Sequence, residues 1–225
     1  MAGELRDYDA AAATWDTNLY RVRLARDVAR TIRERIQLGP SMDVLEIGCG
    51  TGLLTLLLQP HVRSITALDS SAGMLGILES RIRDDGIFGI TTRLMDLEGE
   101  DAWGGSYDLV VSSMTLHHIH NVPHLIHQCF SVLKPGGTLA IADLDSECGM
   151  FHKKTELVYH EGFDRSLLKR EFWQAGFGNI RNCTAAMPVK PDCCGDLRCF
   201  SVFLMTGQKN GNGDRPQSVR KPVEL

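Results

Sequence analysis

Apolar residues recur along residues 19–37 at steps of three and four, the spacing of one buried face of a helix. Similar spacing predicts helices over residues 51–59, 72–83 and 122–133. The last of these follows Asn121, which can cap a helix, and Pro123, which fits a first helical turn. Short apolar runs typical of strands lie between the helices, at residues 42–47, 65–69, 91–97 and 107–113.

This alternation of strands and helices predicts an α/β fold with a doubly wound, mostly parallel sheet and helices on both faces. In such sheets ligands bind at the carboxyl ends of the strands. We therefore expect the polar residues that follow each strand to form the functional site.

The alternation stops after residue 143, where the polar, aromatic-bearing residues 144–163 form an insertion. Asp164 can cap a further helix that carries Leu168 and Phe172. Two more strand-like runs follow, at residues 179–185 and 199–206. Residues 208–225 are rich in glycine, asparagine, proline and charge, which predicts a disordered tail after a single domain over residues 1–207.

Composition narrows the class of protein. The chain has 225 residues, 43% of them hydrophobic and 23% charged, which is ordinary for one soluble globular domain. A net charge of −4 gives no general attraction to nucleic acid or to an anionic membrane. The start of the chain is polar, and no apolar stretch is long enough to span a membrane, so we expect a cytoplasmic protein. Its seven cysteines, with no Cys-x-x-Cys pair, are interpreted as reduced thiols.

The helix over residues 19–37 carries an arginine-rich face. Its arginines are Arg21, Arg23, Arg26, Arg30, Arg33 and Arg35. A solvated cationic face is the favoured interpretation, because the net charge is negative and no aromatic residues alternate with the arginines. An anionic partner such as RNA is the alternative.

Three glycines, Gly48, Gly50 and Gly52, separate the first strand from an apolar helix. Glycines let the backbone take positive φ and approach a ligand closely, and a helix start offers free N–H groups, so a nucleotide-like ligand is indicated. A phosphate-binding loop is excluded because no Gly-Lys-Ser/Thr follows. The dinucleotide fingerprint fails because Leu53 stands where its third glycine would be. The remaining pattern is Glu-x-Gly-x-Gly-x-Gly, beginning at Glu46.

This pattern resembles the first motif of class I S-adenosylmethionine-dependent methyltransferases. The next segments follow the order of that family: one strand ends in Asp69, the next strand also ends in an acid, Asp96, and Pro135-Gly136-Gly137 resembles the turn into the fifth strand. The resemblance covers residues 44–143. It implies a Rossmann-like sheet of seven strands, closed by a hairpin that makes one strand antiparallel.

The resemblance also implies a cofactor, S-adenosyl-L-methionine, with S-adenosyl-L-homocysteine as its product. The backbone at Gly48 and Gly50 would meet the amino acid part of the cofactor, and Glu46 would hold the loop or polar groups of the cofactor. Asp69 would bind the ribose hydroxyls, with a simple helix cap as its alternative role, and Asp96 with Leu97 would frame the adenine. Further predicted cofactor contacts are Cys49, Gly52, Ser70, Met74 and Ser112.

Two segments are candidates for the acceptor side. In similar enzymes an N-terminal helical piece, here residues 1–40, covers the cofactor, so Trp15 is either a lid residue or a packing anchor. The insertion would overhang the site, which makes Phe151, Tyr159 and His160 candidate substrate contacts, although structural packing is the favoured role for each one taken singly.

Five histidines lie between residues 117 and 127. No cysteine or carboxylate nearby in the sequence completes a ligand set, so no metal is predicted. His117 or His118 could act as a general base toward a hydroxyl or enol, since imidazole titrates near neutral pH. A polar contact to the cofactor is the alternative for both.

The leading functional prediction is methyl transfer to an oxygen, carbon or nitrogen atom of a small molecule by a monomer or homodimer. Residues 112–115 lack the Asn-Pro-Pro-Tyr type of sequence that resembles amino-directed nucleic-acid methyltransferases, which argues against a DNA substrate. A protein or RNA methyltransferase is one alternative. A non-catalytic regulator or partner subunit that binds S-adenosylmethionine is another.

Overall fold

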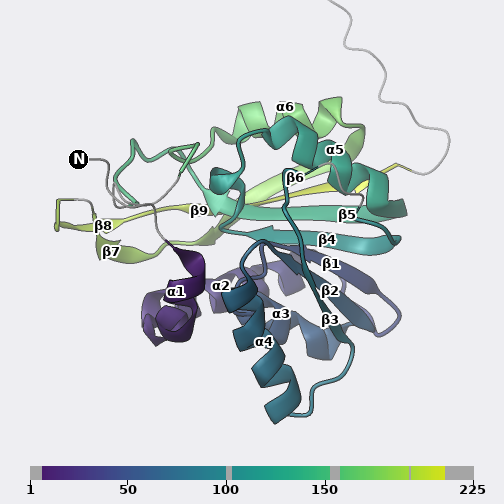
Figure 1. Cartoon of the computed structure of the whole chain (residues 1–225). Helices are drawn as coiled ribbons and strands as arrows, with labels where there is room; N and C mark the ends of the chain where they lie inside the picture. Colours follow the sequence, from purple (N-terminus) through teal and green to yellow (C-terminus); the bar gives the residue numbers. More distant parts are fainter. Residues whose placement is uncertain (1–6, 100–102, 153–157, 193, 211–225) are drawn as a thin grey trace, which may run out of the picture.

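The computed structural model describes residues 7–99, 103–152, 158–192 and 194–210, which form a seven-stranded sheet between helices (Figure 1). Its strands are β1 (Asp43–Ile47), β2 (Ser64–Asp69), β3 (Ile90–Leu94), β4 (Tyr107–Ser113), β5 (Leu133–Leu144), β6 (Phe177–Ala186) and β9 (Val202–Lys209). The strand order is β3-β2-β1-β4-β5-β9-β6. Only β9 runs antiparallel to its neighbours, β5 and β6, so the predicted fold class is confirmed for the described residues.

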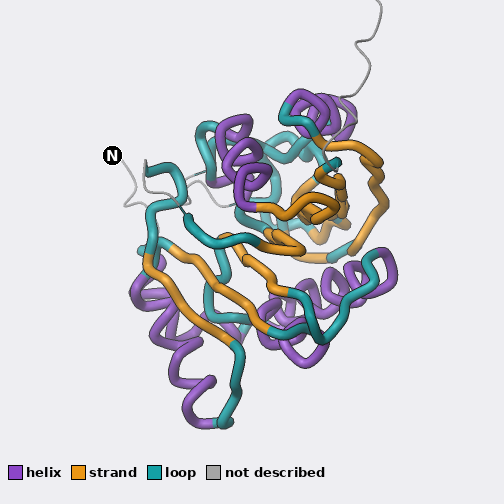
Figure 2. Tube along the Cα trace, turned by 90° about the vertical axis from the view of Figure 1, so that its right-hand side faces the viewer, coloured by secondary structure: helices purple, strands orange, loops and turns teal. Residues whose placement is uncertain are grey.

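Helices cover both faces of the sheet, as Figure 2 shows. The helical segments are α1 (Tyr8–Ala11), η1 (Ala12–Thr17), α2 (Leu19–Arg35), α3 (Leu53–Leu58), η2 (Gln59–His61), α4 (Ala72–Asp84), η3 (Leu116–His118), α5 (Val122–Val132) and α6 (Arg165–Gln174). Helices α5 and α6 enclose one hydrophobic core, and α2 and α3 enclose a second one across the sheet.

Strand β4 shows how both cores depend on alternation along one strand. Val110 packs into the core under α5 and α6, whereas Leu109 and Val111 pack into the core under α2 and α3. Since successive side chains of a strand point to opposite faces, a strand buried on both faces must be continuously apolar. This is why the apolar runs predicted the central strands well.

The structure differs from the prediction near the C-terminus of the described chain. The run predicted as one strand over residues 199–206 is interrupted: Cys199 ends β8 (Leu197–Cys199), which pairs with β7 (Val189–Pro191) in a separate two-stranded hairpin. Strand β9 continues through Gln208 and Lys209, the first two residues of the predicted tail. The remainder of that tail, from residue 211, lies outside the described residues.

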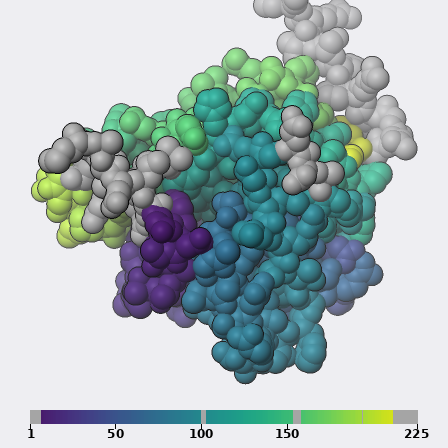
Figure 3. Space-filling model, viewed as in Figure 1, coloured from purple at the N-terminus to yellow at the C-terminus, as the bar shows by residue number. Residues whose placement is uncertain are grey.

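The carboxyl ends of the parallel strands β1, β2 and β4 meet at one edge of the sheet. The N-terminal segment of residues 7–17, here called the N-terminal cover, lies beside α4 at this edge (Figures 1 and 3). Within the described ranges, no helix has the length and apolarity needed to cross a bilayer.

The first testable prediction concerns the cap of α6. The Asp164 carboxylate accepts hydrogen bonds from the backbone N–H groups of Ser166 (2.7 Å) and Leu167 (3.1 Å). Asp164→Ala should therefore lower the free energy of unfolding by about 1 kcal/mol in urea titrations, whereas Asp164→Ser, which keeps an acceptor, should lose less. If both variants lost the same free energy of unfolding, the side-chain acceptor at this cap would contribute nothing to stability.

Candidate active site

A cavity of about 210 Å³ opens at the carboxyl edge of the sheet. It is lined by Tyr8, Trp15, Gly48, Gly50, Asp69, Ser70, Ser71, Met74, Asp96, Leu97, Glu98, Thr115, His118 and Ile119. The ends of β1, β2, β3 and β4 and the N-terminal cover all contribute to this wall. Nine of the seventeen predicted site residues therefore meet at this cavity.

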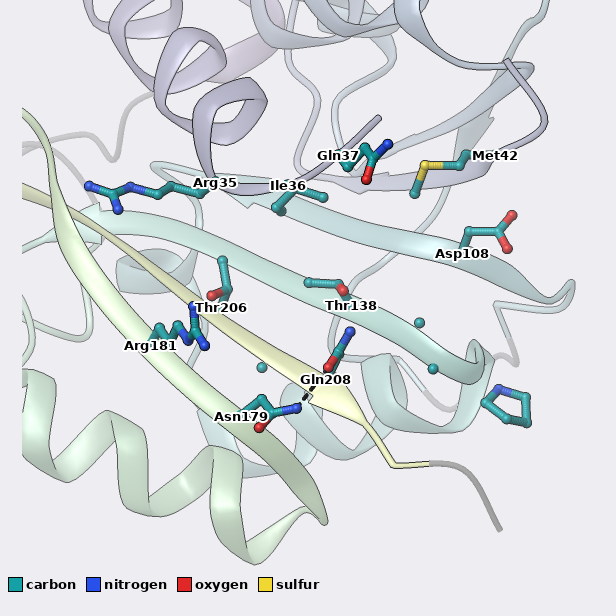
Figure 4. A pocket seen from close by; sticks show the side chains of 14 residues that line it. Arg35, Ile36, Gln37, Met42, Asp108, Thr138, Asn179, Arg181, Thr206 and Gln208 are labelled. Carbon is teal, nitrogen blue, oxygen red and sulfur yellow. Dashed lines mark hydrogen bonds between the residues drawn. The ribbon is translucent and has the colours of Figure 1, made fainter. Parts of the chain in front are cut away.

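A larger hollow of about 590 Å³ lies at the opposite edge of the sheet, shown in Figure 4. Arg35, Arg181 and Gln208 line it, and the Gln208 side chain accepts a hydrogen bond from Asn179 (2.9 Å). None of the predicted site residues is in its wall. Size alone would select this hollow, but the residues suited to chemistry line the smaller cavity.

The three glycines of the loop have positive φ for different physical reasons. Their φ angles are 68°, 54° and 83° at Gly48, Gly50 and Gly52. A Cβ atom on Gly48 would lie 2.2 Å from the Thr115 hydroxyl oxygen, so this glycine lets the loop pack against the end of β4. A Cβ on Gly50 would meet nothing within 4 Å, and Gly50 lines the cavity. Gly50 therefore leaves space for a ligand to approach the backbone.

Asp69 links this loop to the second strand. Its carboxylate accepts the N–H of Gly50 (2.7 Å) and the N–H of Ser71 (2.9 Å). Burial raises its pKa, partly offset by these hydrogen bonds. The N-cap of α4 is Ser71, whose hydroxyl accepts the N–H of Met74 (3.1 Å), so the simple helix-cap role does not fall to Asp69. Each carboxylate oxygen can accept a second hydrogen bond, which leaves Asp69 able to bind ribose hydroxyls.

The far wall of the cavity comes from the segment after β3. This strand ends at Leu94, earlier than predicted, so Asp96 and Leu97 lie in the following turn. The Asp96 carboxylate accepts the N–H of Glu98 (3.0 Å), which shapes this turn. Met74 faces the same cavity from α4.

Two carboxylates hold the N-terminal cover against the loop and α4. Asp9 accepts the N–H of Gly73 (2.8 Å) and the Ser71 hydroxyl, and these contacts lower its pKa. Asp16 accepts the Thr51 hydroxyl (2.7 Å) and forms an ion pair with Arg81. The cover is therefore attached both to the start of α4 and to the residue between two loop glycines.

Tyr8 and Trp15 form the inner surface of this cover. Their ring centroids are 5.7 Å apart, and both side chains line the cavity. The Arg21 guanidinium also packs on Trp15, 3.6 Å from the centroid of its ring. Trp15 thus packs within the cover and also faces the predicted cofactor position.

The two candidate histidines have different surroundings. The His118 ring lines the cavity, and its Nε2 is 3.1 Å from the Tyr8 hydroxyl oxygen. His117 is buried, with its Nδ1 only 2.7 Å from Oδ1 of the buried Asp143. His117 therefore does not reach the cavity, which leaves His118 as the histidine that can contact a ligand. The described residues contain no group of three histidine, cysteine or carboxylate side chains arranged to hold a metal.

Several predicted contacts lie away from the cavity wall. They are Glu46, Cys49, Gly52, Ser112, His117, Phe151, Tyr159 and His160. The Ser112 side chain is buried, and its hydroxyl donates a hydrogen bond to the Ile47 carbonyl (3.1 Å) that joins β4 to β1. The buried Cys49 packs on Leu75 and Leu78, and a Cβ on Gly52 would meet Leu78 at 2.3 Å.

The predicted substrate contacts of the insertion are also placed differently. Phe151 is buried against Phe200 (5.0 Å between ring centroids) and Tyr20 (6.0 Å), so it packs into the core. Tyr159 is 45% exposed and faces the ring of His120. The His160 ring donates from Nε2 to the Ile119 carbonyl (2.9 Å). Residues 153–157 of the insertion lie outside the described chain.

Sequence reasoning did not single out some residues that line the cavity: Tyr8, Ser71, Glu98, Thr115 and Ile119. Tyr8 belongs to the segment that was expected to cover the site. Thr115 and Ile119 flank the two histidines, so their proximity could have been noticed. No local signal marks Glu98, which reaches the cavity only because the turn after β3 bends back.

Glu46 lies in β1, just before the loop, and its side chain is buried near Thr55 of α3. Burial raises its pKa to about 8, with the Thr55 hydroxyl opposing and the Asp69 charge adding to the rise. Its Oε2 atom has no hydrogen-bond partner among the described residues. The side chain is therefore mostly protonated at neutral pH, and its carboxyl has unused capacity to bond a ligand or loop group.

Comparison with known proteins identifies the family. A profile described as the methyltransferase domain matches residues 20–182. The match covers more than half of the chain, so the protein belongs to this family. The resemblance to class I S-adenosylmethionine-dependent methyltransferases that the sequence suggested is thereby confirmed.

The chain is similar to curated proteins over part of their length. An uncharacterized methyltransferase of Schizosaccharomyces pombe is 28% identical over 153 residues, which cover 61% of this chain and 54% of the relative. A malonyl-[acyl-carrier protein] O-methyltransferase of Paenibacillus is 30% identical over 191 residues, covering 76% of this chain and 69% of the relative. The chain thus spans about half the length of the first of these curated relatives and about two thirds of the second.

A solved structure shows the same fold. Phosphoethanolamine N-methyltransferase 2 of Haemonchus contortus, in complex with S-adenosyl-L-methionine, matches with a TM-score of 0.63 and 14% identity. The match covers 81% of this chain and 52% of that chain. At this identity the likeness establishes the fold alone.

The second testable prediction concerns the pH dependence that Glu46 causes. Because its folded pKa is raised to about 8 from 4.5, the folded state binds a proton more tightly than the unfolded state between these values, and stability falls as pH rises. Integrating the two pKa values from pH 5 to pH 8 gives a loss of about 3 kcal/mol. Glu46→Gln should remove this loss in urea titrations across that range.

The exposed Glu79 provides the control, since Glu79→Gln makes the same chemical change without burial. This control should leave the pH dependence of wild type intact. If Glu46→Gln and wild type lost stability in parallel, Glu46 would have an ordinary pKa in the folded protein.

The third testable prediction concerns the N-terminal cover. A Cβ on Gly73 would lie 2.7 Å from the Asp9 Cα atom, a backbone clash, whereas a Cβ on Gly76 of the same helix would meet nothing. Gly73→Ala should therefore displace the cover, which would increase amide exchange in residues 8–17 and weaken the binding of S-adenosyl-L-homocysteine. Gly76→Ala should change neither measurement. Equal exchange in the two variants would mean that the cover does not depend on its contact with α4.

Proposed function

We propose that this methyltransferase binds S-adenosyl-L-methionine in the 210 Å³ cavity and methylates an oxygen, carbon or nitrogen atom of a small molecule. One observation carries the proposal: the open backbone at Gly50, the Asp69 carboxylate and the Asp96–Leu97 turn face one cavity beneath an aromatic cover. These are the features that a nucleoside joined to an amino acid requires.

The residues fit the cofactor in chemical type. Asp69 can accept from two ribose hydroxyls, Met74 and Leu97 offer apolar surface to the adenine, and Asp96 can accept from its amino group. The backbone at Gly48 and Gly50 would meet the amino acid part. Glu46, with its unpartnered oxygen below the loop, would support this end.

Bound S-adenosylmethionine would supply an electrophilic methyl group on a sulfonium. The protein's own contribution is to position the acceptor, exclude water and remove a proton. Tyr8 and Trp15 close the cavity, which serves the first two tasks. The contact between Tyr8 and His118 serves to remove the proton. The acceptor can give its proton to the Tyr8 oxygen while the tyrosine hydroxyl gives its own proton to His118 Nε2.

The small volume of the cavity favours a small acceptor over a protein or RNA. The cavity holds about 210 Å³, and the cover is attached beside it at Asp9 and Asp16, so the described residues leave little space there for a bulky substrate. The similar proteins include an O-methyltransferase and an N-methyltransferase, and both reactions suit an acceptor that must lose a proton. A role as a non-catalytic binding subunit would leave the Tyr8–His118 contact without a use.

The fourth testable prediction concerns cofactor binding. Gly50→Ala places a methyl group in the cavity, and overpacking of this kind costs about 1 to 3 kcal/mol, a loss of about 5- to 150-fold in affinity. Calorimetry with S-adenosyl-L-homocysteine should show this loss. Asp69→Asn should also weaken binding, because one oxygen acceptor becomes a donor.

Gly86→Ala is the matched control for backbone strain. Gly86 has a similar φ of 62°, and its added Cβ would also meet nothing within 4 Å, but it lies outside the cavity wall. This variant should bind the ligand as wild type does. Wild-type affinity in folded Gly50→Ala protein would refute the assigned cofactor position, and absence of methyl transfer to every member of a small-molecule acceptor panel would favour the non-catalytic role.

A further inference from the structure

A buried pair, Asp143 and His117, lies directly behind the cavity. Asp143 follows the last residue of β5 that pairs with β4, and His117 lies in η3, just after β4. Asp143 is 0% exposed and His117 is 1% exposed. Neither side chain has a place in the mechanism proposed above, although both are titratable.

The hydrogen bonds define the state of this pair. Oδ1 of Asp143 accepts hydrogen bonds from His117 Nδ1 (2.7 Å) and from the Leu144 N–H (2.7 Å). Oδ2 of Asp143 accepts a longer hydrogen bond from the backbone N–H of His117 (3.4 Å). Burial alone would raise the pKa of Asp143, but the charge and hydrogen bond of His117 and the Leu144 N–H hold the pKa below its usual range. Since an ionised carboxylate only accepts hydrogen bonds, Nδ1 of His117 carries the proton.

A buried ion pair of this kind is weak evidence for a role in stability, because desolvation of the two charges offsets much of their attraction. The position of the pair suggests a different role. The His117 ring packs on the ring of His118 with 4.1 Å between centroids, and the negative charge of Asp143 also interacts with His118. His118 in turn contacts Tyr8 across the cavity.

His117 also holds the insertion. Its backbone carbonyl accepts the N–H groups of Tyr159 (3.0 Å) and His160 (3.3 Å). The His152 ring lies 4.6 Å from the His117 ring. One short 3₁₀ helix, fixed by Asp143, therefore places both His118 and the acceptor-side insertion.

We propose that Asp143 is a positioning residue for methyl transfer: through His117 it fixes His118 against the cavity, and its charge stabilises the imidazolium that forms when His118 takes the acceptor's proton. This proposal rests on the proposed function. The acceptor atom would bond to the methyl carbon as the bond between that carbon and the sulfonium sulfur breaks, which would leave S-adenosyl-L-homocysteine. The acceptor's proton would pass to the Tyr8 oxygen while the Tyr8 proton passes to His118 Nε2. No oxidant or reductant is needed.

Several groups can affect the charge of His118. They are Tyr8 from α1, His117 from η3, His152 from the insertion, Asp143 from β5, and the cavity carboxylates Asp69, Asp96 and Glu98. A variant that removes only the Asp143 charge measures how much that charge contributes to the ionisation of His118. Asp143→Asn does this while keeping an oxygen that can accept from His117 Nδ1.

The fifth testable prediction uses proton NMR of the imidazole Cε1–H signals, so no acceptor is required. In full-length protein saturated with S-adenosyl-L-homocysteine, the pKa of His118 should be lower in Asp143→Asn than in wild type by about 1 unit. His118→Gln assigns the signal. Asp108→Asn is the control, because it removes one carboxylate at the opposite edge of the sheet. That control should leave the His118 titration unchanged.

The outcomes separate the two proposals. If S-adenosyl-L-homocysteine does not bind the wild-type protein, the proposed function fails. If the ligand binds and the pKa of His118 is the same in wild type and Asp143→Asn, the role of Asp143 is refuted.

A second measurement covers the case in which Asp143→Asn does not fold. In wild type, the Nδ1 proton of His117 should give a slowly exchanging, strongly downfield signal whose position shifts as His118 titrates. Fast solvent exchange of this proton, or a position that does not respond to His118, would overturn the inference.

Discussion

The approach of the glycine loop to the end of β4 is the constraint on which the cavity depends. Gly48 packs so closely on Thr115 that no side chain fits between them, and the Gly48 and Cys49 N–H groups both donate to the Leu68 carbonyl (2.8 and 3.0 Å). Backbone contacts thus join the ends of three strands. The Asp69 carboxylate can then accept the Gly50 N–H and still face the ligand position.

Burial explains which parts of the fold could be predicted from the sequence. Central strands such as β4 are apolar on both faces, and α2 has an apolar stripe, so their patterns were clear. The hairpin of β7 and β8 was not predicted because its residues are largely exposed, with Val189 at 61% and Leu197 at 74%. Exposed strands are formed by hydrogen bonding rather than burial, and hydrophobic periodicity carries no signal for them.

The site was predictable where parallel topology alone determines position. Asp69 follows a strand next to the glycine loop, and this adjacency places it at the cavity. The different surroundings of His117 and His118 were not predictable, since their rings lie only 4.1 Å apart and the partner that holds His117 away from the cavity comes from 26 residues further along the chain. Likewise, Phe151 packs into the core because Phe200 and Tyr20, far away in sequence, surround it.

The attachment of the N-terminal cover has a kinetic consequence. Asp9 and Asp16 hold the cover by charge-assisted hydrogen bonds to Gly73, Ser71, Thr51 and Arg81. A ligand in the proposed site would lie beside Tyr8 and Trp15, so any movement of the cover during ligand release must break these contacts, and lid opening of this kind often limits enzymatic turnover. The strength of a few carboxylate contacts would then set how long spent cofactor remains bound, and with it the susceptibility of the enzyme to inhibition by its own product.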